Sequence, residues 1–251
     1  MSDKTKTITA AILVIGDEIL SGRTKDRNIG YIAEYLTNIG IELREARVVP
    51  DVEDEIVAAL NALRARYTYV FTTGGIGPTH DDITAEAVAK AFGVAIGEDP
   101  RAIAVMMERY APGDLTPARR RMARIPAGAS LVENPISKAP GFRLENVIVM
   151  AGVPSIMQAM LDAAAPGLDT GEKIIAETIE AGGIPEGRYG DALSAIAAAH
   201  PGVSIGSYPS FSDGRFRNQI VVRAKDPAKI AGALEAIAAM IASLRQHDRP
   251  L

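Results

Sequence analysis

The residues best suited to chemistry lie at 72–82, Thr-Thr-Gly-Gly-Ile-Gly-Pro-Thr-His-Asp-Asp, between an apolar run and a helical pattern. Three glycines let this backbone turn tightly and approach a ligand, and the free amides at a helix N-terminus attract phosphate. Two carboxylates, Asp81 and Asp82, follow at once. Phosphate-binding amides beside acidic oxygens predict a divalent cation such as Mg²⁺. The loop's candidate phosphate-binding residues are Gly74, Gly75, Ile76, Gly77 and Thr79.

Three further loops carry small, polar or acidic residues at the boundaries of expected strands and helices. They are residues 16–22 together with the following segment as far as Asn28, residues 133–142, and residues 150–155. In an open α/β sheet, the loops at the carboxyl ends of the strands line one crevice, where ligands bind. These loops add the following candidates for metal, ligand or leaving-group contacts: Asp17, Glu18, Ser21, Asn28, Asn134, Lys138, Gly141 and Gly152.

Alternating strand and helix patterns supply the elements that must position these loops. Three apolar or β-rich runs are typical of buried parallel strands: 8–15, 41–49 and 68–73. A helical pattern follows each run: 29–39, 56–63 and 82–92. Asp51 is placed to cap the second of these helices. Repeated β-α units of this length predict an α/β fold with three layers, αβα, around a mostly parallel sheet.

Later segments are less regular. Residues 99–123 are helical in pattern but are broken by Pro112, Gly113 and Pro117. Residues 142–150 resemble a hairpin with a turn at Glu145-Asn146, and a helical pattern returns from 153 to 164. We therefore expect one more pair of strands, at 142–144 and 147–150.

The segment 165–171, Ala-Pro-Gly-Leu-Asp-Thr-Gly, has the composition of a linker and divides the chain into expected domains 1–168 and 169–251. The patterns after it predict a strand, a helix, two strands and a helix: 173–179, 187–199, 203–208, 216–223 and 227–244. This order predicts a small α+β domain. Its last helix has an apolar stripe that suits either the core of this domain or a homodimer interface. The stripe is Ile230, Leu234, Ile237, Ile241 and Leu244.

The bulk composition serves mainly to exclude functions. A net charge of −4 and a pI of about 5.5 give no support for a nucleic-acid partner. The chain has no cysteine, which removes thiol catalysis and thiolate metal sites. No apolar run reaches the ~20 residues that span a bilayer, so no membrane partner is expected. We expect a cytoplasmic protein that acts on a small molecule.

The four loops, in this order, resemble the molybdopterin-binding domain shared by MoaB and MogA, and are most similar to the CinA (competence/damage-inducible) family. That family's pattern runs roughly G-D-E-I-L-S-G, T-T-G-G-[LI]-G-P-T-x-D-D-x-T-x-E-A, N-P-x-G-x-A-P-G-F and P-G-V-P. This chain follows the second motif through Thr84, Glu86 and Ala87. The resemblance covers residues 8 to about 165, and the region after the linker resembles the CinA middle domain.

The chain departs from these patterns at several positions. Ser137 and Lys138 stand where the third motif has glycine and usually a small residue, and Ala151 replaces a proline in the fourth. In the MoaB and MogA branch an Arg-Asp pair is usual where this chain has Asp81-Asp82. An anion in place of that arginine weakens the case for direct pterin-phosphate binding and strengthens the case for a metal.

The resemblance implies a chemistry. CinA-type domains are associated with hydrolysis of ADP-ribose, and the related domain of some eukaryotic FAD synthases with cleavage of FAD. We expect the glycine-loop amides to hold one phosphate and Lys138 to neutralise the leaving phosphate. The metal would activate water, and which acid acts as the base stays open. Its expected ligands are Asp17, Glu18, Asp81 and Asp82. Homo-oligomers are common in the family, and we expect this chain to form one, with a dimer favoured.

Simpler interpretations remain for most of these residues. The paired aspartates could cap a helix, Asp17-Glu18 and Asn134 could form turns, and Lys138 could be a solvated loop residue. His80 is more typical of an exposed loop residue than of a ligand. The run Arg119–Arg121 is typical of a solvated helical face, although it could attract a diphosphate. Two other functions stay open: a molybdopterin- or other pterin-binding protein of molybdenum-cofactor biosynthesis, or a non-catalytic nucleotide-binding module.

Overall fold

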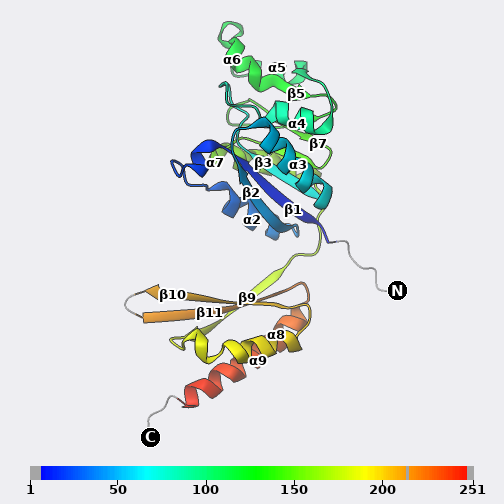
Figure 1. The fold of residues 1–251 in the computed structure, drawn as a ribbon. Coiled ribbons are helices and arrows are strands. Elements are labelled where there is room, and N and C mark those ends of the chain that lie inside the picture. Colours follow the sequence, from blue (N-terminus) through cyan, green and yellow to red (C-terminus); the bar gives the residue numbers. More distant parts are fainter. Residues whose placement is uncertain (1–6, 213–214, 248–251) are drawn as a thin grey trace, which may run out of the picture. The chain divides into compact units, whose positions relative to one another are not determined.

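A computed structural model describes residues 7–212 and 215–247, and the chain divides into two compact units between Gly171 and Glu172 (Figure 1). The first unit is built on a six-stranded sheet of order β2-β1-β3-β8-β7-β6. Neighbouring strands are parallel from β2 to β8, whereas β7 pairs antiparallel with both β8 and β6. The strands are β1 (Thr9–Ile15), β2 (Glu42–Val49), β3 (Tyr69–Thr73), β6 (Ser130–Val132), β7 (Gly141–Leu144) and β8 (Val147–Met150).

Helices cover both faces of this sheet because its strands bury side chains in both directions. One apolar core contains Leu13, Leu60 and Val88, from β1, α3 and α4, and the other contains Ile12, Leu36 and Met157, from β1, α2 and α7. The three-layer αβα fold with a mostly parallel sheet is therefore confirmed. The helices are α1 (Asp17–Leu20), α2 (Asn28–Asn38), α3 (Glu53–Arg66), α4 (Thr84–Phe92), α5 (Pro100–Met107), α6 (Pro117–Arg120) and α7 (Pro154–Ala164).

The strand order places the loops at a point where the chain reverses direction across the sheet. From β1 the chain passes to β2 on one side, and from β2 it crosses back to β3 on the other. The ends of the strands are in register, with Val14 opposite Thr73 and Ile15 opposite Val49. Open α/β sheets bind ligands at such a switch point, outside the carboxyl ends of the strands. The loops after β1 and β3 are thus neighbours.

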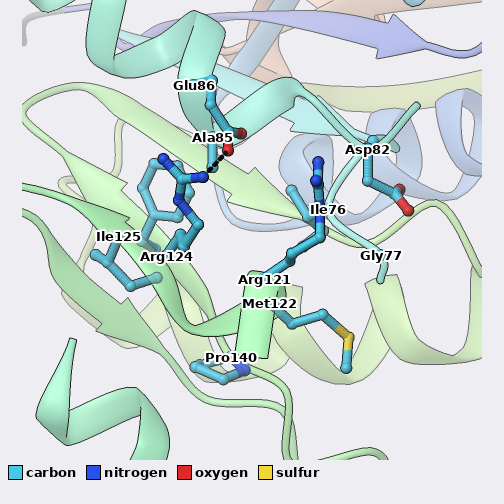
Figure 2. Close-up of a pocket in the computed structure, with 12 residues that line it drawn as sticks. Ile76, Gly77, Asp82, Ala85, Glu86, Arg121, Met122, Arg124, Ile125 and Pro140 are labelled. Carbon is cyan, nitrogen blue, oxygen red and sulfur yellow. Dashed lines mark ion pairs between the residues drawn. The ribbon is translucent and has the colours of Figure 1, made fainter. Parts of the chain in front are cut away.

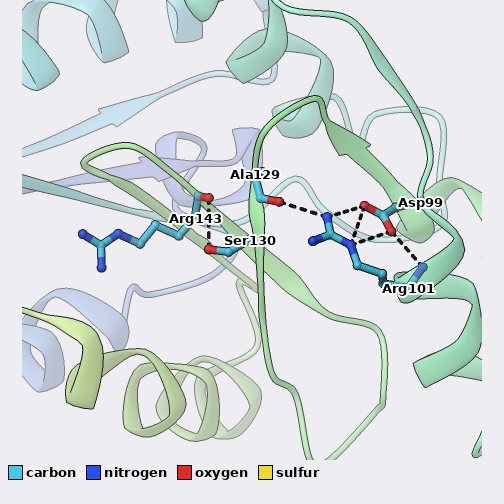
Figure 3. A network of polar contacts seen from close by, with 5 residues as sticks. All are labelled: Asp99, Arg101, Ala129, Ser130 and Arg143. Carbon is cyan, nitrogen blue, oxygen red and sulfur yellow. Dashed lines mark hydrogen bonds and ion pairs between the residues drawn. The ribbon is translucent and has the colours of Figure 1, made fainter.

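The irregular region 99–123 breaks where its prolines predict. It contains α5, α6 and two turns of 3-10 helix at Pro112–Asp114 and Arg121–Ala123. A two-stranded ribbon of β4 (Ile96–Glu98) and β5 (Arg124–Pro126), which the sequence patterns did not indicate, holds this region. Figure 3 shows a further tie, in which Arg101 donates to both the Asp99 carboxylate and the carbonyl of Ala129.

The second unit has the expected β-α-β-β-α order. Its antiparallel sheet, β10-β11-β9, packs against α9 through a core that includes Ile220, Val222 and Ile237. The elements are β9 (Ile175–Gly182), α8 (Gly190–Ala199), β10 (Ser204–Ser212), β11 (Arg215–Ala224) and α9 (Pro227–His247). Short 3-10 turns lie at Ala165–Gly167 and Glu186–Arg188.

Helix α9 corrects one expectation. Its residues Pro227–Gln246 are long and apolar enough to cross a membrane by length and composition, although no comparable run was expected from the sequence. Alanines raise its hydropathy without making it uniformly apolar. Ile230, Ile237 and Ile241 are buried in the core of the second unit, so packing within this unit accounts for the apolar stripe.

The predicted cap of α3 is wrong. The residue that precedes α3 is Val52, with no side-chain cap. The Asp51 carboxylate instead accepts a hydrogen bond from the amide of Asp17, at 2.9 Å. Its nearest polar partner is therefore the loop after β1, which is the first of the loops selected for chemistry.

Candidate functional site

The glycine loop after β3 adopts a backbone that only glycine can take. Gly74 and Gly75 have φ angles of +102° and +65°. A Cβ on Gly74 would lie 2.1 Å from the carbonyl oxygen of Ile15, and one on Gly75 would lie 2.2 Å from the Thr84 hydroxyl. The Thr84 hydroxyl donates to the Gly74 carbonyl and the Thr84 amide to the Gly75 carbonyl, each at 3.0 Å. Buried Thr84, at the start of α4, therefore locks the loop.

Two groups of unpaired amides converge here. Among the residues that the structure describes, no acceptor partners the amides of Gly75, Ile76 and Gly77. The N-terminus of α7 has no side-chain cap, and the amides of Ser155 and Ile156 likewise lack an acceptor in that part of the chain. The loop before α7 packs on the glycine loop, since a Cβ on Gly152 would lie 3.2 Å from the Gly74 Cα. Both groups suit phosphate oxygens.

All four loops selected from the sequence line one cavity of about 640 Å³. This volume falls in the range of small-molecule sites. The structure thus brings together eight of the predicted site residues: Glu18, Gly74, Gly75, Ile76, Gly77, Asp82, Asn134 and Gly152. The apolar part of the wall includes Ile76, Tyr110, Met122, Val153 and Ile156.

A narrow cleft adjoins the cavity and shares the glycine loop with it. Figure 2 shows this cleft between α4 and the segment 121–125, where Glu86 and Arg124 form an ion pair at 3.3 Å. Asp82 and Arg121 also line it. The cleft therefore places the Asp82 carboxylate and the Arg121 guanidinium beside the unpaired amides.

The four predicted metal ligands are divided. Glu18 and Asp82 line the cavity, whereas Asp17 and Asp81 are not part of its wall. Within 7–212 and 215–247, no three His, Asp or Glu side chains are grouped closely enough to hold a metal. The predicted four-carboxylate cluster is therefore not preformed. Glu18 and Asp82 on one cavity wall fit the number of protein carboxylates that Mg²⁺ usually takes, one or two together with waters and substrate phosphates.

Hydrogen bonds fix the acidic pair in different ways. Asp82 Oδ2 accepts from the amide and the hydroxyl of Thr79, at 2.8 and 2.6 Å, and lies against Gly77. Thr79 is not part of the cavity wall, and its predicted ligand contact stays a prediction. Asp81 Oδ1 also accepts from the Thr79 hydroxyl, a bond that lowers the pKa of the exposed Asp81 carboxyl. His80 is exposed over 96% of its side chain, as expected.

Asp51 joins the acidic side of the site. Burial raises the pKa of its carboxyl, and the amide of Asp17 partly opposes this shift. The charges of Asp17, Glu18 and Asp81 raise the pKa further, so these carboxylates lie close enough to repel one another.

Several candidates have structural partners instead of a place in the cavity. Lys138 forms an ion pair with Glu108 at 2.7 Å and is not part of the cavity wall, so its contact with a leaving phosphate stays a prediction. Ser21 is exposed and donates to the carbonyl of Glu18. Gly141 is buried in β7, where a Cβ would lie 2.2 Å from the Val149 carbonyl oxygen. A glycine is therefore needed at position 141 because a larger side chain would collide with the neighbouring strand β8.

The two asparagines shape the loops. Asn28 is buried and donates to the Gly152 carbonyl at 2.8 Å, which positions the loop before α7. Asn134 lies in the wall, but its Oδ1 accepts from the amides of Ile136 and Ser137 and its Nδ2 donates to Ala139. Asn134 is therefore the turn former that one interpretation of the sequence proposed.

Other residues of the site escaped the sequence analysis. Tyr110, Met122 and Ile156 line the cavity from segments without a recognisable motif, and Arg119 joins them with its guanidinium 4.6 Å from the Tyr110 ring centre. Only Arg119 had a signal, as part of a run of arginines that could attract a diphosphate.

Comparison with known proteins assigns both units. Residues 11–170 match the family described as probable molybdopterin binding domain, and residues 175–247 match the middle domain of FAD synthase. A protein of Pyrobaculum calidifontis is 32% identical over 245 residues, covering 91% of this chain and 92% of that protein.

Two further relatives carry the CinA name. A CinA-like protein of Desulfosudis oleivorans is 37% identical over 209 residues, which cover 78% of this chain but 51% of that protein. The chain thus spans about half the length of this relative. A crystal structure of a CinA protein of unknown function from Thermoplasma acidophilum has a TM-score of 0.61 and 37% identity. The match covers 64% of this chain and 99% of the chain in that crystal structure.

Proposed function

Because the chain belongs to the probable molybdopterin-binding domain family, in its CinA-like form with the MoaB/MogA fold, we propose that it is a metal-dependent pyrophosphatase. Its substrate would be ADP-ribose or a related dinucleotide. One observation carries the proposal: two sets of unpaired amides, at Gly75–Gly77 and at the start of α7, face one cavity beside Asp82. Two phosphates in a row would satisfy both sets.

The second unit supports a nucleotide substrate. This unit matches the middle domain of FAD synthase. The product in that enzyme's name, FAD, is a dinucleotide whose two halves are joined by a diphosphate bridge. The apolar side of the cavity, with Tyr110 and Ile156, offers a surface for a flat base.

The protein's own residues would divide the work as follows. The glycine-loop amides bind one phosphate and the amides of Ser155 and Ile156 bind the next, so the phosphoanhydride is held between them. Asp82 and Glu18 would hold a divalent ion, and the chemistry that such an ion would supply when bound is Lewis-acid activation of a phosphate and of water. Thr79 keeps the Asp82 carboxylate at the loop through two hydrogen bonds.

A pterin phosphate is the second candidate ligand. The family description and the apolar wall at Met122 and Val153 favour it, since a pterin is a flat ring that carries phosphate. Asp81 stands where the related pattern has arginine, which argues for the dinucleotide.

The test is hydrolysis of ADP-ribose by the purified protein with Mg²⁺, Mn²⁺ or Co²⁺, and with EDTA, with FAD and NAD run in parallel. We expect metal-dependent release of AMP, which Asp82→Asn abolishes while the variant unfolds at the wild-type temperature. If no dinucleotide is hydrolysed with metal present, a binding assay with molybdopterin would decide between the pterin protein and the non-catalytic module.

A further inference from the structure

We propose that Arg121 binds the phosphate chain of the ligand and is the cation that the glycine loop requires. This inference rests on the proposed function, since it names how the same site recognises a diphosphate. Arg121 lies in the 3-10 turn Arg121–Ala123, far in sequence from the glycine loop. The sequence pointed to it only as a member of the run Arg119–Arg121, which could attract a diphosphate.

The partners of the neighbouring arginines set Arg121 apart. Arg119 donates to the Asp114 carbonyl, Arg120 pairs with Glu98 and Arg124 pairs with Glu86. No acceptor or carboxylate within the described residues partners the Arg121 guanidinium, and its Nε is buried without a hydrogen bond. A buried donor of a charged group costs free energy when it is unpaired. An anionic ligand would remove this cost.

The position of Arg121 identifies that ligand. It lines the narrow cleft together with Gly75, Ile76 and Gly77, whose amides are also unpaired. Figure 2 shows its side chain extending from the helical turn toward the loop that carries Ile76. Arg121 lines this cleft and not the larger cavity, and the two hollows meet at the glycine loop and Asp82, which line both. A guanidinium makes two parallel hydrogen bonds to phosphate oxygens, which suits a phosphate chain in extended contact with the loop.

The nearby acids explain why a cation is needed. Asp82 lines both the cleft and the cavity, and Glu18 adds a second negative charge to the cavity. Glu86 is already compensated by Arg124. A diphosphate that enters beside Asp82 would meet repulsion that backbone amides alone offset poorly, and Arg121 is placed to balance it.

Binding of inorganic pyrophosphate, measured by calorimetry on the full chain with Mg²⁺ present, tests this role without any need for turnover. Charge-assisted hydrogen bonds of this kind predict a Kd that rises roughly 10- to 100-fold in Arg121→Met. Arg121→Lys keeps the charge but loses the paired hydrogen bonds, and should fall between the two. Arg120→Met is the matched control, because its guanidinium pairs with Glu98 outside the cleft, and it should bind as the wild type does.

The outcomes separate this inference from the proposed function. Pyrophosphate binding that depends on Arg121, without hydrolysis of any dinucleotide, would support the phosphate site and refute the pyrophosphatase. Hydrolysis of ADP-ribose with unchanged KM and pyrophosphate affinity in Arg121→Met would keep the enzyme and overturn the role of Arg121. Failure of the wild type to bind pyrophosphate would also overturn it. Thermal unfolding of each variant ensures that only folded protein is compared.

Discussion

Gly77→Ala is a substitution that should separate function from stability. The φ angle of Gly77 is not in the left-handed region, so alanine is tolerated by the backbone. Its Cβ would however lie 2.6 Å from Oδ2, 2.9 Å from Oδ1 and 3.0 Å from Cγ of Asp82. The carboxylate must therefore move away and lose its hydrogen bonds from the amide and hydroxyl of Thr79.

The two effects differ in size. Asp82 is half-buried, so two lost hydrogen bonds should cost about 1–2 kcal/mol, or a few degrees in Tm for a chain of this length. A carboxylate displaced by about 1 Å in an active site can cost roughly 100-fold in rate, and we expect a loss of that order in kcat/KM for ADP-ribose.

Gly30→Ala is the matched control, because nothing lies within 4 Å of its Cβ and Gly30 is in helix α2. It should gain about 0.5–1 kcal/mol and keep its activity. Steady-state kinetics beside thermal unfolding measures both effects. A Gly77→Ala enzyme with wild-type kcat/KM would refute the argument that Asp82 works from this position.

Three other substitutions test separate parts of the structure. Gly75→Ala should lower the free energy of unfolding by about 2–3 kcal/mol in urea titrations, since it adds a left-handed alanine and displaces Thr84; an unchanged midpoint would contradict the loop geometry. The Arg101 guanidinium lowers the pKa of the Asp99 carboxyl, so that contribution to stability is present above about pH 4 and is lost as the pH falls through the folded pKa. Asp99→Asn should thus be destabilised by at most about 1 kcal/mol at pH 7 and should approach the wild type in acid unfolding experiments, while an equal difference at every pH would argue against the ion pair. His80→Ala should keep kcat within about twofold and the same pH profile, because the ring is exposed and is not part of the cavity wall; a changed pH profile would give His80 a role after all.

The fold followed from local patterns because its strands and helices obey them strongly. The apolar run at 8–15 became β1, buried along nearly its whole length, and the glycine loop fell where β3 gives way to α4. The short strands β4, β5 and β6 were missed, since three residues are too few to show a period.

The site was less accessible to sequence reasoning. The motifs predicted that Glu18, Asp82 and Gly152 lie together, because all three follow strands of the same sheet, and all three line one cavity. The motifs could not show that Lys138 forms an ion pair with Glu108. They also could not show that the Asp51 carboxylate accepts from the amide of Asp17 and does not cap α3. Both contacts join segments that only tertiary packing brings together. Likewise, the sequence cannot show that Arg121 lacks a hydrogen-bond partner, because this requires knowing the contacts of all the residues around it.

Hydrolysis of ADP-ribose in H₂¹⁸O, with the products analysed by mass spectrometry, is the decisive test of the pyrophosphatase. We expect metal-dependent formation of AMP and ribose phosphate with one ¹⁸O atom in one of the two phosphates, because water attacks the phosphoanhydride held by the glycine loop. Intact ADP-ribose, with folded protein and metal present, or cleavage at any bond other than the phosphoanhydride, would contradict it.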